Sequence, residues 1–393
     1  MSAAGIVLGA AIALGAYTYL GYPLLLRLLA PPAKRRPPLE PRRDWPRITI
    51  TVPVFNEAAQ IRDTIETLLA VDYPPDRRQI LIVSDASTDG TDDIAATYAD
   101  RGVEVMRLPE RRGKTAAENA ALPRLTGEIV VNTDASVRVQ PDAVKRLVAR
   151  FDDATIGVAS GRDVSIGARA ADANLAESGY VGYEMWVRAL ETRWTGIVGA
   201  SGCLYAARAD VHAVPLPHGT SRDFASILIA RERGLRAASV DDAICFVPRT
   251  SSPRREYRRK VRTMAQGLET LLYKRALLDP LRYGSFAWML ASHKLCRWLV
   301  PWAGVAALAA LAALAPSSIA ARAAIAAAGL AGAATIAGCA WPARRTIPRV
   351  LALPTFAILA NIAALHAWLR VLARRVEPAW EPTRRETAGE PAR

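Results

Sequence analysis

The segment at residues 81–91, with the sequence LIVSDASTDGT, constrains the fold more than any other part of the chain. It begins with an apolar run, which is typical of a buried parallel strand. Polar residues follow that are typical of a turn and a helix N-cap. In an open α/β sheet, ligands bind beyond the carboxyl ends of the strands. We therefore expect Asp85 and Asp89 to lie at the edge of a ligand pocket.

Strand-like and helix-like segments alternate on both sides of this motif, which predicts a mostly parallel sheet covered by helices on both faces. The expected strands are residues 47–53, 79–83, 103–107, 128–132 and 156–160. The expected helices are residues 58–71, 92–100, 112–122, 175–191, 221–234 and 254–273. Residues 201–205 are expected to form a turn that leads into a strand.

Four long segments carry no charged residue, and each is long enough to cross a membrane. They are residues 1–26, 302–321, 323–343 and 350–369. The first has no basic residues before its apolar run, so it does not resemble a cleavable signal peptide. Pro348 and Pro354 make the last segment the weakest candidate for a full span.

The net charge of +14 is concentrated in two blocks, residues 34–47 and residues 249–275. Positive charge beside a span marks the cytoplasmic side, which places the polar middle of the chain in the cytoplasm. Four spans would put the C-terminus outside, whereas the arginines at 374, 375, 384 and 385 favour the inside. Cys203, Cys245, Cys296 and Cys339 lack metal-site spacing, so we expect free thiols.

Five short motifs occur in an order that resembles the cytoplasmic domain of membrane-bound glycosyltransferases of family 2, the group of the cellulose, hyaluronan and poly-N-acetylglucosamine synthases. They are residues 52–57 (VPVFNE), 85–91 (DASTDGT), 133–136 (TDAS), 221–224 (SRDF) and 258–262 (RRKVR). The resemblance implies a GT-A fold, a nucleotide-sugar donor, Mg2+ or Mn2+, and inversion at the anomeric carbon. The expected layout is an N-terminal transmembrane helix at 1–30, a basic linker at 31–46, a GT-A domain at 47–248, a basic amphipathic interfacial segment at 249–285, about three transmembrane helices at 286–373 and a tail at 374–393.

The resemblance assigns one group of residues to the donor nucleotide: Pro53, Asn56, Glu57, Asp85, Asp89 and Lys114. Lys114 follows Gly113 at an expected helix N-terminus, where backbone N–H groups favour a diphosphate. The alternatives are ordinary turn and capping residues for the first five, and a solvated surface lysine for Lys114.

Two further assignments concern the metal and the base. Asp134 and Ser136 match an Asp-x-Asp metal motif in which Ser136 replaces the second acid, and a hydroxyl is a weaker ligand for a hard cation than a carboxylate. Asp223 matches the general base, and Arg222 replaces the acid before it. A cation at 222 is expected to favour the ionised form of Asp223. The alternatives are a loop cap for Asp134 and a first-turn helix acid for Asp223.

Arg262, with Arg259 as the alternative, is assigned to the diphosphate leaving group, although the Gln and Trp of the processive motif are absent. The competing interpretation is that this basic run binds anionic lipid. Glu184, Gly202 and Tyr205 match positions near the donor sugar and acceptor. Glu184 and Arg188 also have the spacing of an ordinary i,i+4 helix pair.

We therefore expect an enzyme that moves a hexose or N-acetylhexosamine, with UDP as the expected carrier, to a lipid-linked or growing glycan in cell-envelope or exopolysaccharide synthesis. A processive polysaccharide synthase is the first alternative, and a catalytically silent nucleotide-binding membrane scaffold is the second. Membrane lipids and export or oligomer partners are expected. Nucleic acid is not, because the basic runs adjoin membrane segments and lack interleaved aromatic residues.

Overall fold

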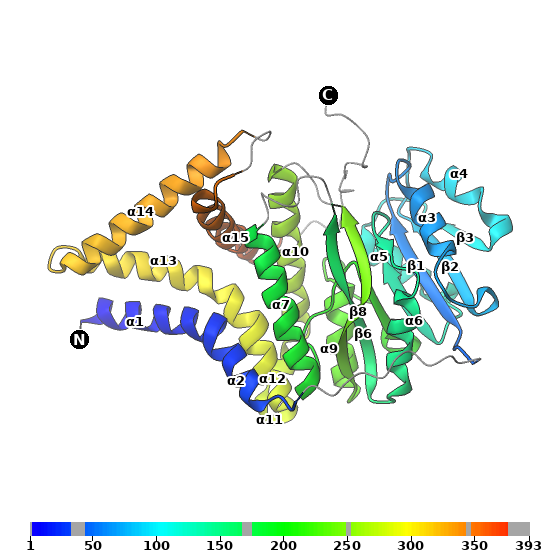
Figure 1. Cartoon of the computed structure of the whole chain (residues 1–393), viewed down its shortest axis with the longest axis horizontal. Coiled ribbons are helices and arrows are strands. Elements are labelled where there is room, and N and C mark those ends of the chain that lie inside the picture. Colours follow the sequence, from blue (N-terminus) through cyan, green and yellow to red (C-terminus); the bar gives the residue numbers. More distant parts are fainter. Residues whose placement is uncertain (1, 33–43, 167–174, 249–252, 343–346, 376–393) are drawn as a thin grey trace.

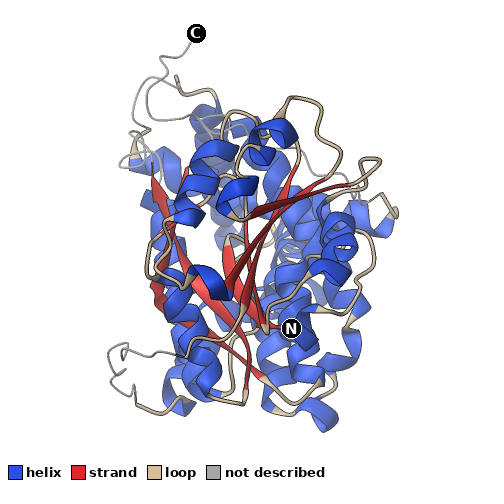
Figure 2. Cartoon of the chain, turned by 90° about the vertical axis from the view of Figure 1, so that its right-hand side faces the viewer, coloured by secondary structure: helices blue, strands red, loops and turns tan. Residues whose placement is uncertain are grey.

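The computed structural model describes residues 2–32, 44–166, 175–248, 253–342 and 347–375. An α/β domain forms one side of the molecule and long helices form the other (Figure 1). The strands pass through the middle of the domain with helices on both sides (Figure 2), as the GT-A expectation requires. The predicted fold class is confirmed.

One mixed sheet of eight strands forms the centre of the domain, in the order β3-β2-β1-β4-β7-β6-β8-β5. The strands are β1 Ile48–Val54, β2 Arg78–Ser84, β3 Val103–Arg107, β4 Ile129–Thr133, β5 Arg138–Val139, β6 Ile156–Ile166, β7 Leu204–Arg208 and β8 Arg236–Pro248. The neighbours from β3 to β4 are parallel, whereas β7 runs antiparallel to both β4 and β6. The sheet is therefore mostly parallel, and β7 and the short edge strand β5 run in the opposite direction.

Helices cover both faces because the strands are apolar on both sides, as expected for buried parallel strands. One face of the sheet packs against α3 Ile61–Leu69, α4 Thr91–Ala96 and α6 Ala143–Val148. On the other face, α5 Lys114–Ala121 packs against β2, whereas α7 Leu175–Trp194 and α9 Arg222–Glu232 pack against β6, β7 and β8. The remaining short helices are α8 Ala209–His212 and α11 Pro280–Tyr283, with 3-10 turns at Pro75–Arg77, Ala99–Arg101, Leu122–Arg124, Ala149–Asp152 and Arg275–Leu278.

The sheet splays open between β1 and β4, where the strand order reverses. Pairing of β1 with β4 stops at Thr51 and Asn132, whereas pairing of β1 with β2 continues to Val54 and Ser84. Pro53, which has no N–H to donate, lies beyond the last β4 partner. Ligands of open α/β sheets bind at such a reversal.

Two strands, β5 and β8, are absent from the predicted elements, and β6 is longer than the predicted 156–160. The cause is visible in β8, where Asp241 and Asp242 interrupt the apolar pattern. The pairing of β6 with β8 also shifts register twice, near Val158 and near Arg162. Such irregularities destroy the two-residue period by which a strand is recognised in a sequence.

Four helices are long and apolar enough to cross a membrane. They are Ala3–Leu29 (α1 Ala3–Ala16 and α2 Tyr22–Leu29), Ser285–Leu314 (α12 Ser285–Leu290 and α13 Cys296–Leu314), α14 Ile319–Cys339 and α15 Arg349–Leu372. Large apolar side chains remain exposed along them, such as Leu28 (81%) and Leu330 (73%), which is expected of surfaces that face lipid. All four cysteines are free, as predicted.

The first two of these long helices both contain a π-helical turn, and the two turns meet. The turns are Tyr17–Gly21 and Ala291–Leu295. Tyr17 Oη lies 2.6 Å from Ser292 Oγ and accepts a hydrogen bond from the Trp288 indole at 2.9 Å. Both helices bend there and continue against the α/β domain (Figure 1). The two helices are thus fixed to each other by hydrogen bonds at the point where they bend.

The basic helix α10, Pro253–Tyr273, packs its apolar stripe on α15. Val261, Ala265 and Leu268 contact Ala363 and Ala367 of α15. Helix α15 continues through Pro354 without a break. Protein therefore covers the apolar face of α10 that the sequence suggests for the membrane interface.

Candidate active site

The loops after β1 and β2 are bound to each other at the carboxyl edge of the sheet. Asn56, with φ of 54°, donates its N–H to Ser87 Oγ at 3.1 Å. Its side-chain oxygen accepts the Thr88 N–H at 2.8 Å. Positive φ is tolerated by asparagine better than by most residues. Asn56 therefore fixes the shape of the loop that the resemblance assigns to the nucleotide.

Glu57 and Asp89 belong to the same loop structure. The Glu57 N–H donates to Thr91 Oγ1 at 2.9 Å, and Asp89 accepts the N–H groups of Ala58 at 3.0 Å and Thr91 at 3.1 Å. Burial acts to raise the pKa of Asp89, but these hydrogen bonds, with that from the Thr91 hydroxyl, lower it overall. Both Asp89 oxygens thus act as structural acceptors, the turn-and-cap role that the sequence left open.

Asp85 anchors the loop that leads into α5. Its side chain is buried, and its two oxygens accept the N–H groups of Arg112 at 2.7 Å and Gly113 at 2.8 Å. Gly113 has a φ of 92°, which favours glycine. The carboxylate therefore places Lys114, the first residue of α5, over the sheet edge.

Lys114 binds Asp134, the residue that follows β4. The distance from Nζ to Oδ1 is 2.6 Å, and the two side chains are 30% and 24% exposed. Burial acts to lower the pKa of Lys114, but Asp134, Glu118 and Asp223 together raise it. Lys114 is therefore a fixed, charged group facing three carboxylates, and not a solvated surface lysine.

The metal-ligand candidates are Asp134 and its neighbour Ser136, which is half-buried. In the part of the chain that the structure describes, no three His, Cys, Asp or Glu side chains gather as a metal site. Mg2+ is often held by one or two carboxylates, with phosphate and water oxygens completing its shell. Asp134 fits that pattern as a single carboxylate at the site, and its partner in the structure is the Lys114 ammonium.

Asp223 lies in the first turn of α9, beside the turn at residues 199–205. Ser221 donates its hydroxyl to Asp223 Oδ1, and a Cβ placed on Gly202 would lie 3.2 Å from Oδ2. The Ser221 N–H donates to Thr270 Oγ1 of α10 at 2.8 Å. Asp223 is thus held near Lys114, with one oxygen directed at the glycine turn.

Arg222 does not serve Asp223, contrary to the expectation. Its buried guanidinium lies 3.4 Å from Glu118 Oε2 and donates to the His212 carbonyl at 2.9 Å. Burial raises the pKa of Glu118, which Lys114 and Arg222 oppose. Arg222 therefore balances a buried acid of α5, and the replacement of an acid by arginine at 222 serves packing between α5 and α9.

The turn at residues 199–205 is rigidly held. Ser201 Oγ donates to Asp163 at 2.5 Å, and its N–H donates to Ser160 Oγ at 2.8 Å. Gly202 is half-buried at the surface of this turn, whereas Tyr205 in β7 is only 2% exposed. Gly202 is therefore placed beside the site, and Tyr205 packs beneath it in the core.

Glu184 of α7 binds the second long apolar helix. Its carboxylate lies 2.7 Å from His293 Nε2 and accepts from Arg297. Burial acts to raise the pKa of Glu184, but His293 and Arg297 hold it well below its usual range. Arg188 instead donates to Ser160 Oγ at 2.5 Å, so the ordinary i,i+4 pair with Glu184 is not formed.

The two candidate leaving-group arginines lie on α10. Arg259 makes a two-pronged ion pair with Glu256 of its own helix, at 2.9 and 2.6 Å. Arg262 is half-buried on the next turn. The contact between Ser221 and Thr270 ties this helix to the start of α9, near Asp223.

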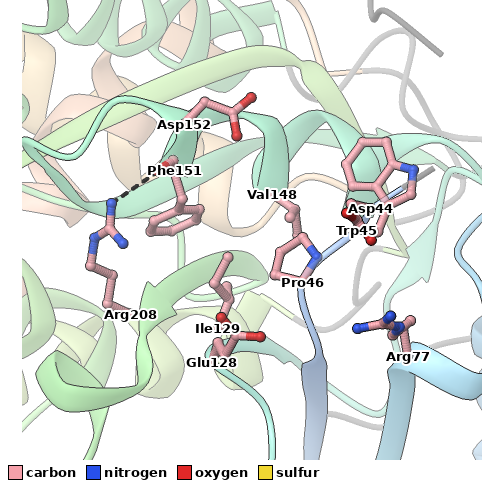
Figure 3. A pocket seen from close by; sticks show the side chains of 10 residues that line it. All are labelled: Asp44, Trp45, Pro46, Arg77, Glu128, Ile129, Val148, Phe151, Asp152 and Arg208. Carbon is pink, nitrogen blue, oxygen red and sulfur yellow. Dashed lines mark hydrogen bonds between the residues drawn. The ribbon is translucent and has the colours of Figure 1, made fainter. Parts of the chain in front are cut away.

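A pocket lies at the opposite edge of the sheet. Trp45, Pro46, Glu128 and Ile129 line it at the amino ends of β1 and β4, with Arg208 from β7 (Figure 3). Ligands of such sheets bind at the carboxyl ends of the strands. The candidate active site is therefore the edge that carries Asp85, Asp134 and Asp223.

Two charged residues near the site are missing from the predicted set. Glu118 follows Lys114 by one helical turn and shares its charge environment. Lys294, from the span Ser285–Leu314, reaches the turn at residue 199, where a Cβ on Gly199 would lie 2.5 Å from Nζ. Ionisable residues in an apolar helix are a recognised signal of function, and that signal is present at residues 293–297.

The chain is similar in sequence to a glycosyltransferase family and to individual enzymes of that kind. The family model for "Glycosyl transferase family 2" matches residues 49–199. An N-acetylglucosaminyltransferase of Mesorhizobium japonicum is 31% identical over 137 residues, which are 34% of this chain and 31% of that protein. A beta-monoglucosyldiacylglycerol synthase of Synechocystis is 32% identical over 140 residues, 34% of this chain and 29% of that protein. The chain thus spans about a third of the length of these curated relatives.

A solved structure resembles nearly the whole chain. The mannosyltransferase PcManGT from Pyrobaculum calidifontis, in complex with GDP-Man and Mn2+, superposes with a TM-score of 0.71 at 25% identity. The match covers 94% of this chain and 99% of that one. The similarity therefore includes the apolar helices as well as the α/β domain.

Proposed function

The chain belongs to glycosyl transferase family 2, and from this we propose that it transfers a hexose or N-acetylhexosamine from a nucleotide-diphosphate sugar to an acceptor at the membrane. The observation that carries the proposal is the meeting of Lys114, Asp134 and Asp223 at the carboxyl edge of the sheet. The Lys114 ammonium can bind a diphosphate directly, and the Asp134 carboxylate can bind it through a divalent cation. The Asp223 carboxylate can accept the proton of an acceptor hydroxyl.

The donor diphosphate is proposed to bind at Asp134 and Lys114. The similar mannosyltransferase was solved with Mn2+, and Asp134, assisted weakly by Ser136, would hold Mg2+ or Mn2+ here. A bound divalent cation would offset the charge of the departing diphosphate. Lys114 adds a second positive charge from the N-terminus of α5, and Arg262 or Arg259 would contribute another from α10.

Asp223 is proposed as the general base. Its carboxylate accepts the proton of the acceptor hydroxyl while that oxygen attacks the anomeric carbon from the side opposite the diphosphate. A single displacement of this kind inverts the anomeric configuration. The Ser221 hydroxyl, which donates to one oxygen, holds the carboxylate so that the other can face the acceptor.

The nucleotide, the sugar and the acceptor are proposed more broadly. UDP is the carrier expected from the sequence, whereas the similar mannosyltransferase was solved with GDP-Man, so both nucleotides belong in the test. The four apolar helices and the basic flanks support an inner-membrane location with the domain in the cytoplasm. A lipid-linked or growing glycan of the cell envelope or an exopolysaccharide would then be the acceptor.

Two alternatives remain open. A processive synthase would need a path for its product, and the three C-terminal apolar helices would have to be supplemented by oligomers or partners. A silent scaffold would retain the fold and bind nucleotide without turnover. The change at Ser136 favours the scaffold, whereas the ordered placement of Asp134 and Asp223 favours an enzyme.

The proposal is tested by release of nucleoside diphosphate from UDP- and GDP-sugars, using the full chain purified in detergent with Mn2+. An enzyme should release UDP or GDP from at least one donor and do so faster when membrane lipid extract is added. Nucleotide binding without any release, with or without extract, would support the scaffold instead.

A further inference from the structure

Three basic residues, His293, Lys294 and Arg297, lie in the domain-facing part of the second long apolar helix, Ser285–Leu314. Charged groups in a membrane helix are costly, and they usually pair with one another or serve a ligand. These three residues can therefore be sorted by asking which have partners within the protein.

His293 and Arg297 have such partners. The two ring nitrogens of His293 lie 2.5 Å from Glu191 Oε1 and 2.7 Å from Glu184 Oε1. Arg297 donates to the other oxygen of Glu184. Tyr22 of the first long helix also donates to Glu191, at 2.5 Å. This network joins both helices to α7.

Lys294 differs from its neighbours. Within the described part of the chain, its ammonium makes neither a hydrogen bond nor an ion pair. The ammonium lies 5.5 Å from the centre of the Phe224 ring, and Phe224 directly follows Asp223 in the sequence. The charges that reach it over longer distances are Glu184, Glu191, Asp223 and the opposing Arg297.

Two glycines of one turn make room for Lys294 and for the proposed base. A Cβ on Gly199 would lie 2.5 Å from Lys294 Nζ, and one on Gly202 would lie 3.2 Å from Asp223 Oδ2. The ammonium and the carboxylate therefore approach the same short turn near its two ends. A ligand whose hydroxyl meets Asp223 would present its neighbouring groups to Lys294.

We propose that Lys294 binds the phosphate or diphosphate of a lipid-linked acceptor. This inference rests on the proposed function and names the class of its acceptor. The donor diphosphate is proposed above to bind at Lys114 and Asp134, which pair with each other, whereas Lys294 comes from an apolar helix. Exposed apolar side chains, including Leu20, Leu24 and Trp302, lie on the two helices and offer a surface for a lipid chain.

A binding experiment on the full chain in detergent tests this inference without requiring turnover. The probes are farnesyl phosphate and farnesol, which differ only in the phosphate. Hydrogen bonds to charged groups contribute about 1.5–3 kcal/mol, so we expect wild type to prefer farnesyl phosphate by roughly 10- to 100-fold. Lys294→Met should abolish most of this preference, and Lys294→Arg should retain much of it.

Two further variants guard against indirect effects. Gly199→Ala keeps the ammonium but crowds its position, and it should also reduce the preference. Arg322→Met, which removes an exposed cation from α14, should leave it intact. If folded Lys294→Met keeps the preference for farnesyl phosphate over farnesol, the inference is overturned. It is also overturned if this variant keeps the preference but loses affinity for UDP or GDP, because Lys294 would then bind the donor. If the protein transfers no sugar, that result counts against the proposed function. The preference for farnesyl phosphate over farnesol can still be measured, because binding does not require turnover.

Discussion

Lys114 Nζ lies 2.6 Å from Asp134 Oδ1, and this ion pair connects the first residue of α5 with the residue that follows β4. The lysine therefore holds the carboxylate that is proposed to take a divalent cation. Binding of metal and diphosphate would require Lys114 to exchange this carboxylate for phosphate oxygens. The pair is thus a preformed charge arrangement into which the donor can bind.

The first prediction concerns metal dependence. Removal of divalent cations with EDTA should abolish sugar transfer, and Mn2+ should restore it. Asp134→Asn keeps the shape of the side chain but weakens a hard-cation ligand. Calorimetry should show that this change reduces donor affinity far more in Mn2+ than in EDTA. Equal donor affinity with and without metal, in both proteins, would remove Asp134 from the metal site.

The second prediction concerns Asp85 as a loop anchor. In Asp85→Asn the amide has one acceptor oxygen, so the N–H of Arg112 or Gly113 loses its partner. A buried unsatisfied group costs about 1–3 kcal/mol, and the free energy of unfolding should fall by that order even without donor. Chemical unfolding monitored by tryptophan fluorescence measures it, with exposed Asp93→Asn as the control. Unchanged stability with weakened donor binding would instead indicate a direct nucleotide contact.

The third prediction concerns Arg262. Arg262→Lys keeps the charge and loses the planar fork, so turnover in detergent should fall sharply while flotation with anionic liposomes stays normal. Arg258→Lys, at an exposed position of the same helix, is the matched control and should change neither quantity. Normal turnover in Arg262→Lys would remove Arg262 from the leaving-group site. Arg259 would then be the candidate, and it would have to break its ion pair with Glu256 to bind the diphosphate.

The fourth prediction is a pH dependence at Glu184. Because its folded-state pKa is well below the ordinary 4.5, its ionised form stabilises the fold above that value. This contribution should be lost as pH falls through the lowered pKa. Thermal unfolding in detergent should therefore show a smaller acid-induced drop in Tm for Glu184→Gln than for wild type, with exposed Asp100→Asn behaving like wild type. If Tm falls by the same amount with decreasing pH in Glu184→Gln and in wild type, the pairing of Glu184 with His293 and Arg297 is contradicted.

The parallel half of the sheet could be predicted because its signals are local. The strands around Ile50 and Ile82 are continuous apolar runs that end in polar turns, and Asp85 and Asp134 follow such runs directly. Strand β8 could not be predicted, since Asp241 and Asp242 hide it and only its pairing with β6 defines it.

The partners of the site residues were less predictable because they are distant in sequence. Glu184 meets His293, which lies 109 residues further along the chain, and not Arg188 on the next turn of its own helix. Arg222 likewise pairs with Glu118 of another helix. Local spacing suggests the nearest opposite charge, whereas the packing of α7 on the apolar helices decides the actual one.

The most direct test of the account is Asp223→Asn, measured for turnover and donor affinity on the same preparation. The asparagine keeps the shape of the side chain but cannot accept the acceptor proton. Loss of a general base typically lowers the rate by about 10²–10⁴-fold. We predict a fall in kcat of that order with donor Kd nearly unchanged. Turnover close to that of wild type would show that Asp223 only stabilises the start of α9, and it would contradict the proposed mechanism.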